Sequence, residues 1–114
     1  MTGNAGEMEQ ITPRQLKAWL DDPSRARPVL VDVREPWERD VCRIPECFEM
    51  PMNAIPARAG ELDAAADTVL VCHHGARSFQ VGLYLESRGF ARVHNLFGGV
   101  DAWARSVDPA MATY

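Results

Sequence analysis

The residues most suited to chemistry lie in the stretch VCHHGARS, residues 71–78, where a cysteine ends an apolar run and an arginine follows in the same loop. An ordinary thiol has a pKa of about 8.5 and is mostly protonated at pH 7, so a nucleophilic cysteine needs groups that favour the thiolate. A following helix N-terminus would supply backbone N–H groups, Gly75 permits a tight turn, and Arg77 adds a permanent cation. The same donors would hold an oxyanion above the Cys72 sulfur. The stretch is therefore a candidate thiol nucleophile in an anion-binding loop.

Two other interpretations of this stretch stay open. A free cysteine is most often a small buried apolar residue, and a plain strand-to-helix turn explains these residues about as well as a nucleophile does. A metal site is a weaker interpretation, because the consecutive side chains of Cys72, His73 and His74 are expected to diverge. We therefore expect no metal site. The two histidines either tune the charge of the loop, since an imidazole titrates near pH 6.5, or point to solvent while their amides line the loop.

The elements that must position this loop follow from hydrophobic patterning. Thr12 and Gln15 match a capping box and Pro13 suits the first helical position, so a helix is predicted from Pro13 to about Asp22. The runs at residues 29–33 and 68–72 are too continuously apolar for strands with one wet face. We predict that both are buried parallel strands, and that the second delivers Cys72 to its loop.

Further elements alternate along the chain. We predict a short helix or turn at 35–40, a strand within 46–52, a short helix within 53–65, a helix that begins near Ser78 and stops at Gly89, a strand at 92–96 and a last helix at 97–106. The segment 106–114 has no periodicity, and we expect it to be disordered. This order predicts an α/β domain with a parallel sheet and helices on both faces. Ligands bind at the carboxyl ends of the strands in such sheets, where Cys72 and Asp32 would lie.

Composition excludes several classes of protein. The chain has 114 residues, which suits one domain, and 46% hydrophobic with 25% charged residues is ordinary for a globular protein. The net charge of −4 and the scattered basic residues argue against nucleic acid as a partner. A polar N-terminus and the lack of a long apolar run lead us to expect a cytoplasmic protein that does not enter a membrane. Three cysteines without a CxxC pair predict free thiols.

Four segments in order resemble a single-domain rhodanese, a member of the thiosulfate sulfurtransferase-like family: VLVDVREPWE, RIPECFEMPMNAIPAR, VLVCHHGARS and GFARVHNLFGGVDAWA. The likeness runs from about Ile11 to about Pro109. It implies a rhodanese-like three-layer α/β domain with a central five-stranded parallel sheet, and hence an edge strand near Ile11. We therefore expect a polar extension at 1–10, the domain at 11–109 and a tail at 110–114.

The resemblance also implies which residues form the site. Cys72 would be the nucleophile that carries a persulfide sulfur. Asp32 and Arg34 would brace the loop or pocket, and Trp37 either walls the pocket or simply packs. The substrate would be held by the loop residues His73, His74, Gly75, Ala76 and Arg77, with Ser78 in support.

Loop length favours sulfur transfer over phosphate hydrolysis. Cell-cycle dual-specificity phosphatases share the fold but place five residues between cysteine and arginine, whereas four separate Cys72 from Arg77. The resemblance then implies transfer of a sulfane sulfur from thiosulfate or a related small anionic donor to a thiol, cyanide or protein acceptor, with no metal or cofactor. Alternatives are a catalytically weak rhodanese module that binds or regulates a partner, and a redox enzyme that uses Cys42 or Cys47 as a resolving thiol. Both of these cysteines more simply fill small sites beside a strand.

Other residues with a chemical side chain receive simpler interpretations. Glu35 and Glu38 are expected to be capping or solvated charges. Trp19 and Trp103 fall on helical faces and are predicted core residues, and His94 is predicted to be a satisfied strand residue.

Overall fold

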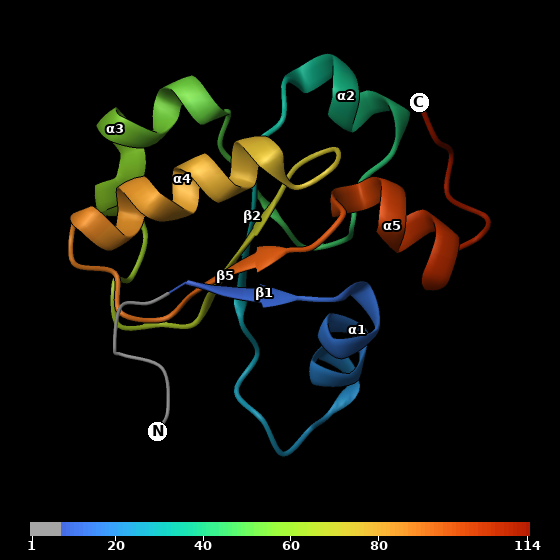
Figure 1. The fold of residues 1–114 in the computed structure, drawn as a ribbon, viewed down its shortest axis with the longest axis horizontal. Coiled ribbons are helices and arrows are strands. Elements are labelled where there is room, and N and C mark those ends of the chain that lie inside the picture. The colour runs from blue at the N-terminus through green and yellow to red at the C-terminus, as the bar shows by residue number, and fades with distance from the viewer. Residues whose placement is uncertain (1–7) are drawn as a thin grey trace.

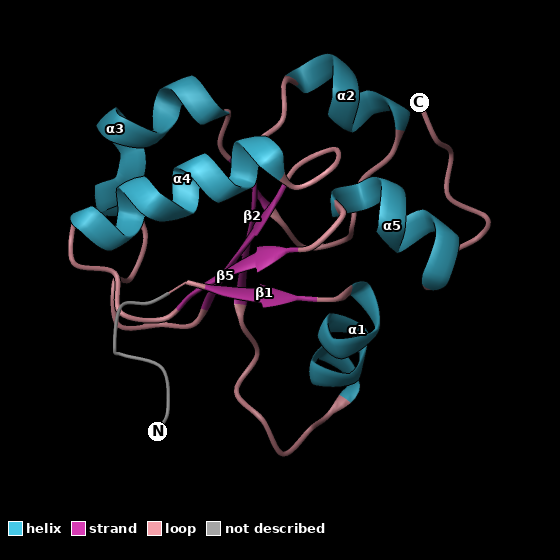
Figure 2. Ribbon diagram, in the orientation of Figure 1, coloured by secondary structure: helices cyan, strands magenta, loops and turns pink. Residues whose placement is uncertain are grey.

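A computed structural model of the chain describes residues 8–114. The chain forms a five-stranded, all-parallel sheet in the order β1-β5-β4-β2-β3, with helices on both faces (Figures 1 and 2). The strands are β1 (Glu9–Ile11), β2 (Val29–Asp32), β3 (Phe48–Glu49), β4 (Thr68–Val71) and β5 (Val93–Leu96). The predicted α/β class, the five parallel strands and the edge strand at Ile11 are therefore confirmed.

The helices follow the strands, as predicted. They are α1 (Pro13–Asp21), α2 (Pro36–Val41), α3 (Ile55–Arg58), α4 (Ala76–Ser87) and α5 (Gly99–Ser106), with 3₁₀ turns η1 (Met52–Ala54) and η2 (Ala59–Glu61) on either side of α3. The capping box of α1 is present, since the Thr12 hydroxyl accepts from the Gln15 amide and the Gln15 side chain accepts from the Thr12 amide. Gly89, at φ +95°, ends α4 in the left-handed conformation that the sequence predicts.

Side chains of the central strand divide between two cores. Val69 and Val71 face a core that α1 and α5 cover, whereas Leu70 and Cys72 face the core beneath α3 and α4. This alternation is the period of two that a strand imposes, and it explains why the strand is apolar at every position. Trp19 and Trp103 lie in the first of these cores, as predicted.

Several predicted boundaries are wrong by small amounts. Helix α4 begins at Ala76, two residues before Ser78, because Gly75 at φ +103° already forms its N-cap. By contrast, the short helix predicted within 53–65 is confirmed as the four-residue α3 with its 3₁₀ turns. Strand β1 begins at Glu9, so the end of the predicted extension at 1–10 joins the sheet, while residues 1–7 lie outside the described part of the chain. Within residues 8–114, none of the helices has both the length and the apolar character that a membrane crossing requires.

Candidate active site

The Cys72 sulfur lies at the carboxyl end of β4, the middle strand of the sheet. The residue is 1% exposed. Its Sγ accepts hydrogen bonds from the backbone N–H groups of Gly75, at 3.1 Å, and Ser78, at 3.4 Å. The sulfur also faces the first turn of α4, whose N-terminus carries partial positive charge. The predicted backbone donors therefore reach the sulfur, although they belong to only two residues, Gly75 and Ser78.

A buried polar network supports the underside of this loop. The Ser78 hydroxyl lies 3.2 Å from Cys72 Sγ and 2.5 Å from Oδ1 of Asn95 on β5, so its single proton serves one acceptor at a time. Nδ2 of Asn95 donates to the Gly75 carbonyl at 3.1 Å and to Oε1 of Gln10 on β1 at 3.0 Å. The amide of one side chain thereby links the loop to the neighbouring strands.

The start of α5 is joined to the Cys72 loop by two backbone hydrogen bonds. The Val100 N–H donates to the Cys72 carbonyl at 2.9 Å, and the Asp101 N–H donates to the His73 carbonyl at 3.1 Å. Gly99 has φ +61°, and a Cβ there would lie 2.4 Å from the Cys72 carbonyl oxygen and 2.3 Å from that of His73. The paired glycines are therefore a turn, as predicted, and the second one is required by the close approach of the loop that carries Cys72.

Arg77 lies in a bidentate ion pair. Its two terminal nitrogens donate to the two carboxylate oxygens of Glu38, both at 2.7 Å. These bonds raise the pKa of Arg77 and lower the pKa of Glu38 to about 2 against the opposing effect of burial. Glu38 also caps its own helix by accepting from the Glu35 amide. The predicted capping role of Glu38 is confirmed. The alternative prediction, that its charge is exposed to solvent, is wrong because the residue is 4% exposed.

Asp32 and Arg34 form a second ion pair that is fully buried. Arg34 donates to both oxygens of Asp32, and its remaining groups donate to the backbone carbonyls of Glu38 and Cys42. Burial opposes the charge on Arg34, but the hydrogen bonds to Asp32 and Tyr114 outweigh it and raise its pKa. The pair contacts α2 and the turn after it, and thereby positions the helix that carries Glu38.

The expectation that the segment 106–114 is disordered is wrong. The Tyr114 hydroxyl donates to Glu38 at 2.8 Å and accepts from Arg34 at 3.1 Å. Its ring stacks on His73 with centroids 3.8 Å apart, and Trp37 meets it edge-on at 5.7 Å. These contacts involve residues far away in sequence, so local periodicity carries no sign of them. Trp37 is 62% exposed and joins the site through Tyr114.

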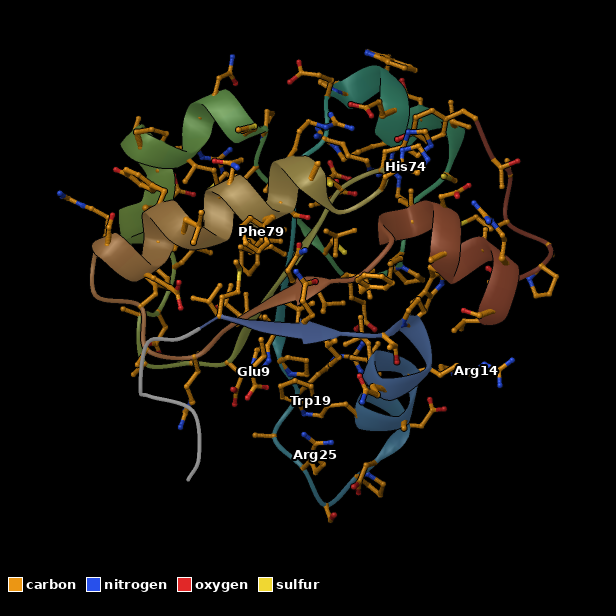
Figure 3. All side chains as sticks on the ribbon, in the orientation of Figure 1. Glu9, Arg14, Trp19, Arg25, His74 and Phe79 are labelled. Atoms are coloured by element: carbon orange, nitrogen blue, oxygen red, sulfur yellow. The ribbon has the colours of Figure 1, made fainter. Side chains whose placement is uncertain are left out.

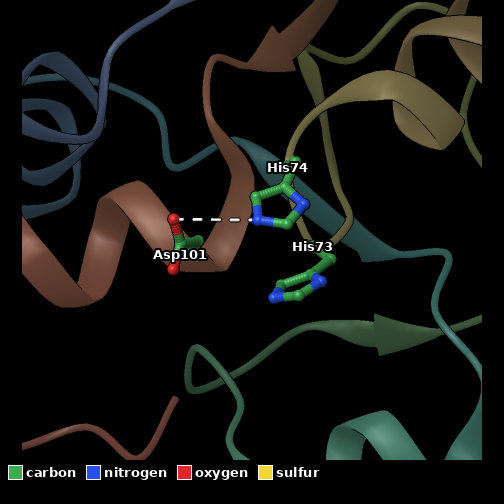
Figure 4. Close-up of side chains that lie close together, drawn as sticks. All are labelled: His73, His74 and Asp101. Carbon is green, nitrogen blue, oxygen red and sulfur yellow. Dashed lines mark ion pairs between the residues drawn. The ribbon is translucent and has the colours of Figure 1, made fainter. Parts of the chain in front are cut away.

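The two histidines do not diverge, which corrects the sequence prediction. The ring centroids of His73 and His74 lie 3.9 Å apart. The His74 side chain, labelled in Figure 3, is 64% exposed. Its Nε2 lies 3.8 Å from Asp101 Oδ2 (Figure 4). His73 is instead covered by Tyr114, and burial together with the neighbouring His74 lowers its pKa. Only His74 therefore matches the prediction of a solvent-facing side chain.

The other two thiols are placed as the simpler interpretation predicts. Cys42 and Cys47 both pack against the core beneath α1 and α5. Burial raises the pKa of Cys47 to about 12, so this thiol is protonated at neutral pH. A protonated thiol is a poor nucleophile, which argues against Cys47 as a resolving cysteine. His94 has a hydrogen-bond partner, as predicted, because its Nε2 lies 3.0 Å from the carboxylate of Asp67.

The sequence did not predict that three residues near the Cys72 loop belong to the site. Asn95 carries a signal, because an amide in a strand whose other residues are buried or half-buried needs hydrogen-bond partners. Glu38 and Tyr114 carry no such signal, since their partners come from α4, from α2 and from the segment after β2, which only the fold brings together.

Comparisons with known proteins agree with this geometry. A family model described as Rhodanese-like domain matches residues 12–106. A protein named sulfurtransferase from Allochromatium vinosum is 44% identical over 84 residues, which covers 74% of this chain and 78% of that protein. A protein named thiosulfate sulfurtransferase GlpE from Pseudomonas syringae is 32% identical over 97 residues, which covers 85% of this chain and 88% of that protein.

The fold matches solved structures as well. A rhodanese-like domain protein from Staphylococcus aureus superposes with a TM-score of 0.78 at 31% identity, covering 94% of this chain and 99% of that one. Some relatives are longer, and this chain spans only 38% or 28% of their length. The matched residues include the whole sheet after β1, the cysteine loop and the glycine turn that holds it. The chain belongs to the rhodanese-like domain family.

Proposed function

We propose that this protein is a sulfurtransferase that moves a sulfane sulfur from thiosulfate, or a related small anionic donor, to a thiophilic acceptor through a persulfide on Cys72. The observation that carries the proposal is the set of donors at the sulfur: two backbone N–H groups and the Ser78 hydroxyl lie within 3.4 Å of Sγ. Relatives named sulfurtransferase support the same class of reaction.

The first half of the reaction forms the persulfide. The Cys72 thiolate attacks the outer sulfur of thiosulfate, a new S–S bond forms, and the bond between the two thiosulfate sulfurs breaks. Sulfite leaves with the electron pair of that bond, and the negative charge on the cysteine side moves to the outer sulfur. The N–H groups of Gly75 and Ser78 point at Sγ, so they would stabilise the negative charge on Sγ as it attacks, without reorganisation.

The second half regenerates the enzyme. An acceptor nucleophile such as cyanide or a thiolate, including a thiolate of an acceptor protein, attacks the outer sulfur of the persulfide. The S–S bond to Cys72 breaks, and the cysteine thiolate leaves with the electron pair. Sulfur is transferred as a neutral atom in both halves, so the cycle requires no external oxidant or reductant.

Arg77 would hold the anionic part of the donor with the N–H groups that Glu38 leaves free. A guanidinium has five N–H donors, and two of them are engaged by Glu38. Because the carboxylate offsets the charge of Arg77, the donor anion would depend more on the loop amides and the α4 N-terminus than on a free cation. Loss of Arg77 is therefore expected to weaken thiosulfate binding moderately, with the persulfide step intact.

Intact mass spectrometry tests the proposal. The reduced wild-type protein is treated with excess thiosulfate, desalted and weighed, beside Cys72→Ser and Cys42→Ser. We expect wild type and Cys42→Ser to gain the mass of one sulfur, Cys72→Ser to gain none, and cyanide to remove the added sulfur as thiocyanate. No gain on wild type, or the same gain on Cys72→Ser, would refute the proposal. The absence of any gain would instead favour the alternative of a rhodanese module that binds a partner without catalysis.

A further inference from the structure

A cluster of metal-ligating side chains lies at the outer side of the nucleophile loop. His73, His74 and Asp101 each offer one ligand atom, and these three atoms all lie within 4.8 Å of one another (Figure 4). The two histidines come from the loop after β4, whereas Asp101 comes from the first turn of α5. The cluster thus joins two elements that are far apart in sequence.

The backbone around the cluster is held in place before any ion binds. The Asp101 N–H donates to the His73 carbonyl, and the Val100 N–H donates to the Cys72 carbonyl. The left-handed turn at Gly99 allows this close approach. Since both ligand-bearing elements are tied to each other, binding requires only side-chain rotation and no movement of the backbone.

The ligand atoms are close to the spacing that a tetrahedral ion needs. Metal–ligand bonds of 2.0–2.1 Å place neighbouring ligand atoms about 3.3 Å apart in a tetrahedral site. His74 Nε2 and Asp101 Oδ2 lie 3.8 Å apart, which is too far for a hydrogen bond but near this value. The His74 side chain is 64% exposed and free to rotate by the small amount required.

The surroundings of His73 match those of a metal ligand. Its Nε2 lies 3.0 Å from the backbone carbonyl of Tyr114, and its ring stacks on the Tyr114 ring. Metal-bound histidines commonly donate their second ring N–H to a carbonyl or carboxylate, which fixes the tautomer and the ring orientation. In the tautomer that donates from Nε2, the lone pair of Nδ1 is available to an ion.

The carboxylate of Asp101 already forms an ion pair with a cationic side chain. Oδ2 of Asp101 pairs with the Arg105 guanidinium one turn later, whose side chain is 74% exposed. An exposed arginine is held weakly, so an ion with two nitrogen ligands can displace it. Two imidazoles and one carboxylate suit borderline divalent metals such as Zn²⁺, and the exposed position of His74 leaves room for water as a fourth ligand.

We propose that His73, His74 and Asp101 form a binding site for a divalent transition-metal ion of the Zn²⁺ type, beside the nucleophile and separate from its thiol. The site depends on none of the sulfur chemistry proposed above. Because His73 directly follows Cys72, an ion bound there would sit at the entrance to the nucleophile loop.

Zinc binding to the full chain tests the proposal. The parent protein is Cys72→Ser, which removes the active-site thiol as a competing ligand, and affinity is measured by competition with a chromophoric zinc indicator. We expect the parent to bind one Zn²⁺ per chain. His74→Ala and Asp101→Asn should each weaken binding at least tenfold, and both changes are at positions where the side chain is not part of the core. His94→Gln serves as the matched control, because His94 pairs with Asp67, which lies at the opposite end of β4 from Cys72, and the variant should bind as the parent does.

A second readout identifies the ligand atoms. Co²⁺ added to the parent should give d–d absorption bands without a thiolate-to-cobalt charge-transfer band, because the proposed ligands are nitrogen and oxygen. Absence of zinc binding by the parent, affinity unchanged by His74→Ala, or a strong charge-transfer band would each overturn the proposal. Failure of persulfide formation in the wild-type protein would leave these outcomes unaffected, so the two proposals are tested separately.

Discussion

The ion pair between Glu38 and Arg77 is expected to contribute to stability in a pH-dependent way, and Glu38→Gln measures it. The substitution keeps the size of the side chain but removes the carboxylate that accepts from both terminal nitrogens of Arg77 and from the Tyr114 hydroxyl. Those contacts, Arg77 first, lower the pKa of Glu38 from its ordinary value of 4.5 to about 2. Because the residue is 4% exposed, solvent screening is weak.

The size of the effect follows from the pKa. At about 1.4 kcal/mol for each tenfold change in proton affinity, the lowered pKa of Glu38 corresponds to about 3 kcal/mol of stability at pH 7. The folded state binds the proton less tightly than the unfolded state does, so this contribution is complete above pH 4.5 and disappears as the pH falls to about 2. Linkage leaves about 1 kcal/mol of it at pH 3.

Urea unfolding of wild type and Glu38→Gln at pH 7 and pH 3 measures the contribution. We expect the variant to lose about 3 kcal/mol of unfolding free energy at pH 7, and the difference between the proteins to shrink by about 2 kcal/mol at pH 3. Glu61→Gln is the control, because Glu61 pairs with Arg58 on the surface and its loss should have no measurable effect. A difference that is the same at both pH values, or smaller than about 1 kcal/mol at pH 7, would contradict this account of the pair.

Three further predictions concern the supports of the site. Gly99→Ala should lower the free energy of unfolding in urea by about 2 kcal/mol or more, because φ is +61° and a Cβ there meets two backbone carbonyls. Gly60→Ala is the control and should cost far less, because the space at its Cβ is open. Equal losses would show that the close approach at Gly99 is unimportant. Arg34→Met should cost roughly 3–5 kcal/mol because it leaves the fully buried Asp32 unpaired, and a loss below about 1 kcal/mol in the same assay would argue against a charged pair. Tyr114→Phe keeps the ring but removes the hydroxyl that bridges two charged groups, so we expect a loss of about 1 kcal/mol, and unchanged stability would mean that the bridge contributes nothing.

The sequence was sufficient to predict those elements that depend on residues close together in the chain. The buried strands at 29–32 and 68–71 are visible as continuous apolar runs, the helix at Pro13 as a capping box, and the end of α4 as a glycine. The Cys72 loop could be located for the same reason, since a cysteine that ends a buried parallel strand must lie at the edge of the sheet where ligands bind. The family resemblance added the edge strand at Ile11, which three residues are too short to reveal by periodicity.

Only the tertiary structure decided which groups surround that loop. Glu38 and Arg77 are 39 residues apart in sequence and meet because β2 and β4 are neighbours in the sheet. Tyr114 belongs to a segment without periodicity, and long-range contacts with Arg34, Glu38 and His73 alone give it a fixed place. The sequence by itself placed Cys72 and Arg77 in one loop after a buried strand, and the family resemblance predicted that Cys72 is the sulfur nucleophile. The fold decided that Arg77 is paired with a carboxylate, because the order of the strands brings α2 beside α4. It also decided that two histidines expected to diverge lie together beside Asp101, because the first turn of α5 is hydrogen-bonded to the loop that carries them.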